Sequence, residues 1–76
     1  MLKIKNEVNL KELEKFGFKD TGLEYKWFDS VGYPCDTIRV AKDYKDIRFI
    51  IYNSFEGILN KLYDLITAGL VEKVER

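Results

Sequence analysis

The sequence predicts a small α+β domain: an antiparallel sheet of three strands, with four or five as alternatives, packed by a C-terminal amphipathic helix and joined by a short N-terminal helix. Three observations predict this fold. Apolar and polar residues alternate in the middle of the chain, as they do in half-buried strands. After residue 54, apolar residues recur at spacings of three and four, as on one side of a helix. A glycine follows each helical segment, where helices commonly end.

The first two elements are predicted by local signals. Residues 1–5 alternate apolar and charged side chains, which is typical of a short strand. Asn9 is a candidate N-cap for a helix over Leu10–Phe16, and Glu12 stands three residues after the cap, as in a capping box. Gly17 is placed to end this helix in the left-handed conformation.

Three strands are expected next, over residues 23–28, 37–41 and 47–52, with the proline-containing segment 29–36 as a loop. Because the connections are short, these strands form an antiparallel meander. The side chains expected on the covered face are Leu23, Tyr25, Trp27, Ile38, Val40, Ile47, Phe49 and Ile51. The opposite face then carries Glu24, Lys26, Phe28, Thr37, Arg39, Arg48, Ile50 and Tyr52.

The second helix begins after Ser54, a candidate N-cap, and ends at Gly69. Its apolar stripe is expected to cover the sheet. The residues of this stripe are Phe55, Ile58, Leu59, Leu62, Tyr63 and Ile66. Gly57, in the first turn, either weakens the helix by up to about 1 kcal/mol or lets it approach the sheet closely. Residues 70–76 read as a short strand or a frayed tail.

Size and composition limit the classes of function. Seventy-six residues make a single domain over residues 1–76. Thirteen basic residues balance thirteen acidic ones, so the basic excess typical of phosphate-binding proteins is missing. No apolar run approaches the roughly 18 residues that span a bilayer, and the single cysteine, Cys35, cannot form an internal disulfide. A cytoplasmic location without membrane contact is expected.

The sequence offers little for catalysis. It has no histidine and no pair of cysteines, and its glycines are scattered singly, so the commonest general base, zinc ligands and phosphate loops are missing. Cys35 has no histidine to activate it. Four aspartates near the predicted turns match no metal-loop spacing and are interpreted as turn residues. They are Asp29, Asp36, Asp43 and Asp46. We therefore expect no enzyme, no cofactor and no metal.

The outward face of the predicted sheet is the first candidate binding surface. Aromatic residues and arginine are enriched at protein interfaces, and this face combines both types. The candidate partner-binding residues are Phe28, Arg39, Arg48, Ile50 and Tyr52. Together with Lys26, Arg39 and Arg48 lie among aromatic residues, and this arrangement resembles a platform on which nucleic-acid bases stack. The competing interpretation is that the first helix or first strand covers part of this face and the rest is ordinary solvated surface.

The loop containing Val31, Gly32, Tyr33 and Pro34 is the second candidate surface. Tyr33 beside the only proline is placed either to anchor a partner or to fold down over one end of the core. The sequence leaves these two alternatives open.

Both ends of the chain resemble a known group of proteins. The opening, residues 3–18 (KIKNEVNLKELEKFGF), and the ending, residues 62–74 (LYDLITAGLVEKV), are similar to the ends of small uncharacterised proteins carried by phages and prophages of Gram-positive bacteria. The resemblance implies a phage or prophage protein, and it carries over no functional residue. Small phage proteins without catalytic residues commonly act by stoichiometric binding.

Two hypotheses follow. The first is a non-catalytic phage- or prophage-type protein that binds a partner protein, as an inhibitor or accessory factor, with host defence proteins among the candidate targets. The alternative is a single-stranded nucleic-acid-binding protein that uses Lys26, Arg39 and Arg48 on the exposed sheet face. A homodimer formed through an edge strand or the first strand is a further prediction.

Overall fold

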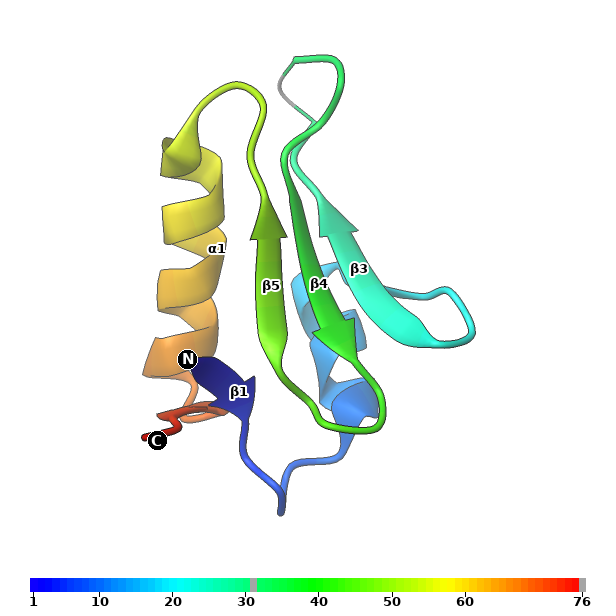
Figure 1. Ribbon diagram of the computed structural model, residues 1–76, viewed down its shortest axis with the longest axis vertical. Coiled ribbons are helices and arrows are strands. Elements are labelled where there is room, and N and C mark those ends of the chain that lie inside the picture. Colours follow the sequence, from blue (N-terminus) through cyan, green and yellow to red (C-terminus); the bar gives the residue numbers. More distant parts are fainter. Residues whose placement is uncertain (31, 76) are drawn as a thin grey trace.

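The described part of the chain, residues 1–30 and 32–75 of a computed structural model, holds two antiparallel sheets and two helices (Figure 1). In chain order the elements are β1 (Leu2–Ile4), the 3-10 helix η1 (Leu10–Phe16), β2 (Lys19–Asp20), β3 (Glu24–Phe28), β4 (Thr37–Ala41), β5 (Ile47–Ile50), α1 (Phe55–Thr67) and β6 (Val71–Lys73). The larger sheet has the strand order β2-β3-β4-β5, and β1 pairs with β6 in the smaller one. The predicted α+β class and the three-stranded meander are confirmed, and β2 adds a fourth strand at one edge.

The two chain ends meet in the smaller sheet. Leu2 pairs with Lys73 and Ile4 with Val71 in antiparallel register, so the predicted first strand is confirmed. Of the two alternatives for the last segment, a short strand or a frayed tail, the strand is found at residues 71–73. A bridge from Lys3 to Asp46 links β1 to the start of β5. The first strand is thus paired within its own chain. Arg76, the last residue of the predicted tail, lies outside the described residues.

The first helix begins and ends where the sequence predicts. The Asn9 side chain accepts a hydrogen bond from the Lys11 backbone N–H at 3.0 Å. Gly17 has φ 89°, and the Phe18 N–H donates to the Leu13 carbonyl at 3.2 Å, which is the Schellman ending. The segment winds as a 3-10 helix along its whole length.

The second helix follows its predicted caps as well. The Ser54 hydroxyl accepts from the Glu56 N–H at 3.2 Å, and the Leu70 N–H donates to the Leu65 carbonyl at 3.1 Å beyond Gly69, which has φ 79°. A Cβ added at Gly57 would collide with the Asp29 carboxylate. The glycine therefore permits a close approach, the second of the two interpretations offered for it.

The core lies on one face of the four-stranded sheet, and both helices pack on that face. Its buried apolar residues are Ile4, Leu13, Phe18, Tyr25, Ile38, Val40, Ile47, Ile58, Leu62 and Leu65. The predicted alternation has the right phase, since Tyr25 pairs with Val40 and Trp27 with Ile38. Because η1 contributes Leu13 to this core, the interpretation that the first helix covers the outward face is wrong. The first strand lies at the edge of that face, where Met1 and Lys3 line a hollow together with Asp46 and Arg48.

Two residues expected on the covered face are exposed. Leu23 is 89% exposed and Ile51 46% exposed. Both lie just outside a strand, Leu23 in the turn before β3 and Ile51 after β5. The alternation that orients side chains holds only within a paired strand, and the predicted strands were too long by one residue at the start of β3 and by two at the end of β5.

The helix α1 buries only two residues of its predicted six-residue apolar stripe, Ile58 and Leu62, and it also buries Leu65, which was not predicted to lie in the stripe. Its buried residues are Ile58, Leu62 and Leu65. Phe55, Leu59, Tyr63 and Ile66 are instead between 43% and 68% exposed. The prediction that the whole stripe covers the sheet is wrong for these four, because the inward face is shared with η1 and offers too little surface for the full apolar width of the helix. Within the residues described, no helix combines the length and apolar character that a bilayer crossing requires.

Candidate functional site

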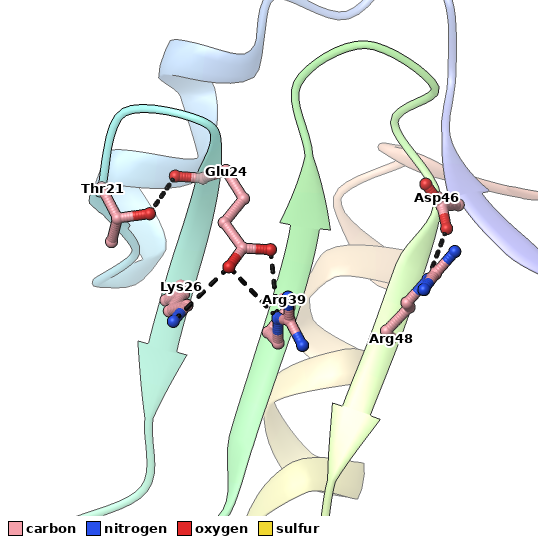
Figure 2. A network of polar contacts seen from close by, with 6 residues as sticks. All are labelled: Thr21, Glu24, Lys26, Arg39, Asp46 and Arg48. Carbon is pink, nitrogen blue, oxygen red and sulfur yellow. Dashed lines mark hydrogen bonds and ion pairs between the residues drawn. The ribbon is translucent and has the colours of Figure 1, made fainter.

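The outward face of the four-stranded sheet, called the open face below, carries one cation on each strand. Lys19 pairs with Lys26, Lys26 with Arg39, and Arg39 with Arg48. Because directly paired residues of antiparallel strands share a face, these four side chains form one transverse row. Figure 2 shows three of them, with the helices behind the sheet. Like charges placed opposite each other destabilise a sheet, so this row costs stability and is a candidate for function.

Two carboxylates partly neutralise the row. Glu24 accepts from Arg39 Nε at 3.0 and 3.2 Å and pairs with Lys26 Nζ at 3.4 Å, whereas Asp46 accepts from Arg48 Nε at 2.8 Å (Figure 2). Hydrogen bonding by Arg39, together with the smaller effects of the Arg39 charge and of Lys26, outweighs desolvation and lowers the pKa of Glu24. Glu24 is therefore ionised at neutral pH. Asp43 lines the same hollow as Glu24, Arg39, Asp46 and Arg48. Four cations and these three anions leave the open face with a small positive excess.

Beside the cation row lies a shallow apolar depression of about 310 Å³. It is lined by Lys26, Phe28, Tyr33, Pro34, Cys35, Thr37, Ile50 and Tyr52. The structure thus brings four of the predicted partner-binding residues together, namely Phe28, Tyr33, Ile50 and Tyr52, and places Arg39 and Arg48 in the adjacent row of the same face. Phe28 is 51% exposed and Tyr52 61% exposed, so both rings are accessible.

The loop residue Tyr33 projects into solvent at the rim of this depression. It is 94% exposed, so the alternative in which it folds over the core is wrong. The Asn53 side chain donates to the Pro34 carbonyl at 2.6 Å, and a Cβ at Gly32 would collide with Asn53. These contacts tie the loop to the segment after β5. Val31, named with this loop above, lies outside the described residues.

A buried carboxylate holds the position of Tyr52. Asp36 is 1% exposed and accepts from the backbone N–H groups of Tyr52 at 2.6 Å, Asn53 at 2.9 Å and Ser54 at 3.0 Å. The hydrogen bond from Tyr52 is the largest cause of the lowered pKa of Asp36. Its interpretation as a locally bonded turn residue is wrong, since its partners are 16–18 residues away in the sequence. Asp36 therefore fixes both the rim of the depression and the start of α1.

The chemically reactive groups are few in the part of the chain that the structure describes. No group of three or more potential metal ligands occurs there. Cys35 is half-buried, and its thiol donates to the Gly32 carbonyl at 3.5 Å. Asp20, at the sheet edge, has a lowered pKa chiefly because Lys42 hydrogen-bonds to it, and burial raises the pKa of Tyr25. What the open face offers is a positively charged, partly apolar surface for noncovalent contact.

A second accessible surface was missed by reasoning from the sequence. The exposed part of the α1 stripe, called the outer row below, consists of Phe55, Leu59, Tyr63 and Ile66. Its spacing is visible in the sequence, but the same spacing is what a core-facing helix shows. No sequence signal separates the outer row from the inner row of Ile58, Leu62 and Leu65.

Comparison of the chain with protein-family models, with curated proteins and with solved structures gave no match. The functional argument therefore depends on the two surfaces themselves.

Proposed function

We propose that this is a small non-catalytic phage- or prophage-type protein that binds a partner protein through its open face, as an inhibitor or accessory factor in the host cytoplasm. The observation that carries the proposal is the joint placement of Phe28, Tyr33, Ile50 and Tyr52 around one depression beside a row of cations. Exposed aromatics beside arginines are the residues that dominate binding energy at protein interfaces.

The charge of the open face defines the kind of partner that fits. Four cations against three carboxylates favour a surface with acidic side chains, which would be attracted before contact and oriented on arrival. The apolar depression then favours an apolar or aromatic side chain placed beside those acids. Host proteins with such a surface, defence proteins included, are the expected targets.

The test is affinity capture from a Gram-positive bacterial lysate with three forms of the protein. We expect the wild type to retain a defined protein and the Phe28→Ala, Tyr52→Ala double variant to lose it. The control is Tyr63→Ala, which removes an equally exposed tyrosine from α1. Binding is then measured by calorimetry with the purified partner. Retention of the same protein by the double variant would refute the proposal.

The cation row supports a second candidate function, binding of single-stranded nucleic acid. Bases could stack on Phe28 and Tyr52 while phosphates follow the row. If all four cations contact phosphates, the logarithm of affinity should fall against the logarithm of salt concentration with a slope of about −3. Fluorescence polarisation with labelled oligonucleotides of mixed sequence tests this. An absence of binding at low salt removes this candidate and leaves the protein-binding proposal intact.

A further inference from the structure

The outer row of α1 is an apolar surface that neither sheet covers. Two contacts mark the limits of the packed side of the helix. Phe55 meets Phe49 of β5 edge to face, with ring centroids 6.4 Å apart, and Lys61 Nζ lies 5.2 Å from the centroid of the Trp27 ring on β3. The inner row lies between these two contacts. The outer row begins at Phe55, and its other members lie on the side of the helix that faces solvent.

The exposed area is large for so small a protein. Its four large apolar residues are 43–68% exposed, which leaves on the order of 400 Å² of apolar surface uncovered. This area is typical of the largest apolar patch on a monomeric protein, and such patches are often functional. The row extends along a helix of 13 residues, about 20 Å long at 1.5 Å per residue. Exposure of this kind favours association.

We propose that the outer row binds a second copy of this chain, with the two α1 helices antiparallel across a two-fold axis. The row is nearly symmetric about the level of residues 60 and 61. In an antiparallel pair, Phe55 therefore lies opposite Ile66 of the second copy, and Leu59 opposite Tyr63. Each pair sets an aromatic ring against an aliphatic side chain, so one surface serves both copies, as a two-fold interface requires.

Electrostatics permit this pairing. The chain has no net charge, so two copies do not repel each other at long range. At the level of the axis the exposed polar side chain is the neutral Asn60, since Lys61 is turned toward Trp27. Glu56 and Asp64 lie at levels where the second copy presents apolar residues or glycine, so no two like charges face each other. The antiparallel helix dipoles add a small favourable contribution.

The area also sets the strength of the pair. Two outer rows would bury on the order of 800 Å² in total, below the roughly 1,200 Å² of standard stable interfaces. We therefore expect a reversible dimer with a dissociation constant on the order of 100 µM. The open face stays accessible in this dimer, so partner binding and self-association use separate surfaces.

Analytical ultracentrifugation from about 10 µM to about 1 mM, a range that spans the expected dissociation constant, is the first test. We expect the mean mass to rise from 9.0 kDa toward twice that value. Leu59→Lys should weaken the dimer at least tenfold, whereas Asp64→Asn, which changes the charge equally but lies off the row, should not. A wild type that stays monomeric at the highest concentration, or a Leu59→Lys variant that associates as the wild type does, overturns the proposal and leaves the row to a different protein.

Disulfide trapping tests the geometry. In a Cys35→Ser background, the single variants Leu59→Cys and Tyr63→Cys are mixed in equal amounts and oxidised gently. The antiparallel pair predicts that the mixed disulfide exceeds random pairing. A random distribution, or an excess of the two like-with-like disulfides, contradicts the antiparallel arrangement.

Discussion

The inner and outer rows of α1 are chemically alike and structurally opposite. Ile58 and Leu65 are fully buried, whereas Leu59 and Ile66 on the adjacent row are each 47% exposed. The four residues belong to one helix with one pair of caps, so neither propensity nor capping separates them. What separates them is the surface that each row meets: β-strands and η1 on one side, solvent on the other. An apolar stripe on a helix therefore indicates which side chains are suited to burial. The elements packed against the helix determine which of them are buried.

The strongest test of this comparison is a pair of matched substitutions. Ile58→Ala should lower the free energy of unfolding by about 3 kcal/mol, because it leaves a cavity in the core, and Leu59→Ala by less than about 1 kcal/mol. A domain of this size is stable by only about 4–11 kcal/mol, so the first change is severe. Chemical denaturation measures both values at low protein concentration, where the dimer is dissociated. Equal losses would mean that the two rows are not differently buried.

The second test addresses what orients the helix. Asp36→Asn should lower the melting temperature by roughly 10 °C, because a neutral amide cannot satisfy the three N–H groups that the carboxylate accepts. Asp43→Asn is the control, since the Asp43 carboxylate is on the surface and accepts from the adjacent Tyr44 N–H at 2.8 Å. Its melting temperature should change by no more than about 2 °C. Circular dichroism gives both values, and a similar loss in the two variants would contradict the anchoring role of Asp36.

A third test uses the close approach at Gly57. Alanine normally stabilises a helix relative to glycine by up to about 1 kcal/mol. At this position the new methyl group meets the Asp29 carboxylate, so we expect Gly57→Ala to destabilise by about 1 kcal/mol instead. Asn60→Ala, on the exposed side of the same helix, should stabilise by a few tenths of a kcal/mol. Opposite signs in urea denaturation would show that the first turn of α1 is held tightly against the end of β3.

The smallest expected effect is a dependence of stability on acid. The folded state lowers the pKa of Asp36 below its usual value of 3.8, so the unfolded chain takes up a proton first as the pH falls. The stability that this carboxylate contributes is complete above its usual pKa and is lost as the pH falls through that value toward the lowered one. Urea denaturation at pH 6 and pH 3 should show a smaller acid-induced loss in Asp36→Asn than in the wild type. An unchanged pH dependence would contradict this.

Local features of the fold were determined by the sequence itself. Asn9, Gly17, Ser54 and Gly69 start and end the two helices because each acts through hydrogen bonds or backbone conformations within a few residues of its own position. The same holds for the phase of β3, β4 and β5, since the period of a strand is set by its own pleat. Four of the six predicted partner-binding residues, Phe28, Arg39, Arg48 and Ile50, share the open face as this alternation requires. Tyr33 and Tyr52 lie outside the strands and line the depression beside that face. The role of all six in binding remains a prediction.

Only the tertiary structure decided the rest. It buried two residues of the α1 stripe and exposed the other four, left Leu23 and Ile51 in solvent, completed the cation row with Lys19, and joined Asp36 to the backbone of residues 52–54. Each of these outcomes depends on the distance between segments that are remote in the sequence. Burial and long-range hydrogen bonds each need two segments in contact. The sequence of one segment does not say which other segment will lie against it.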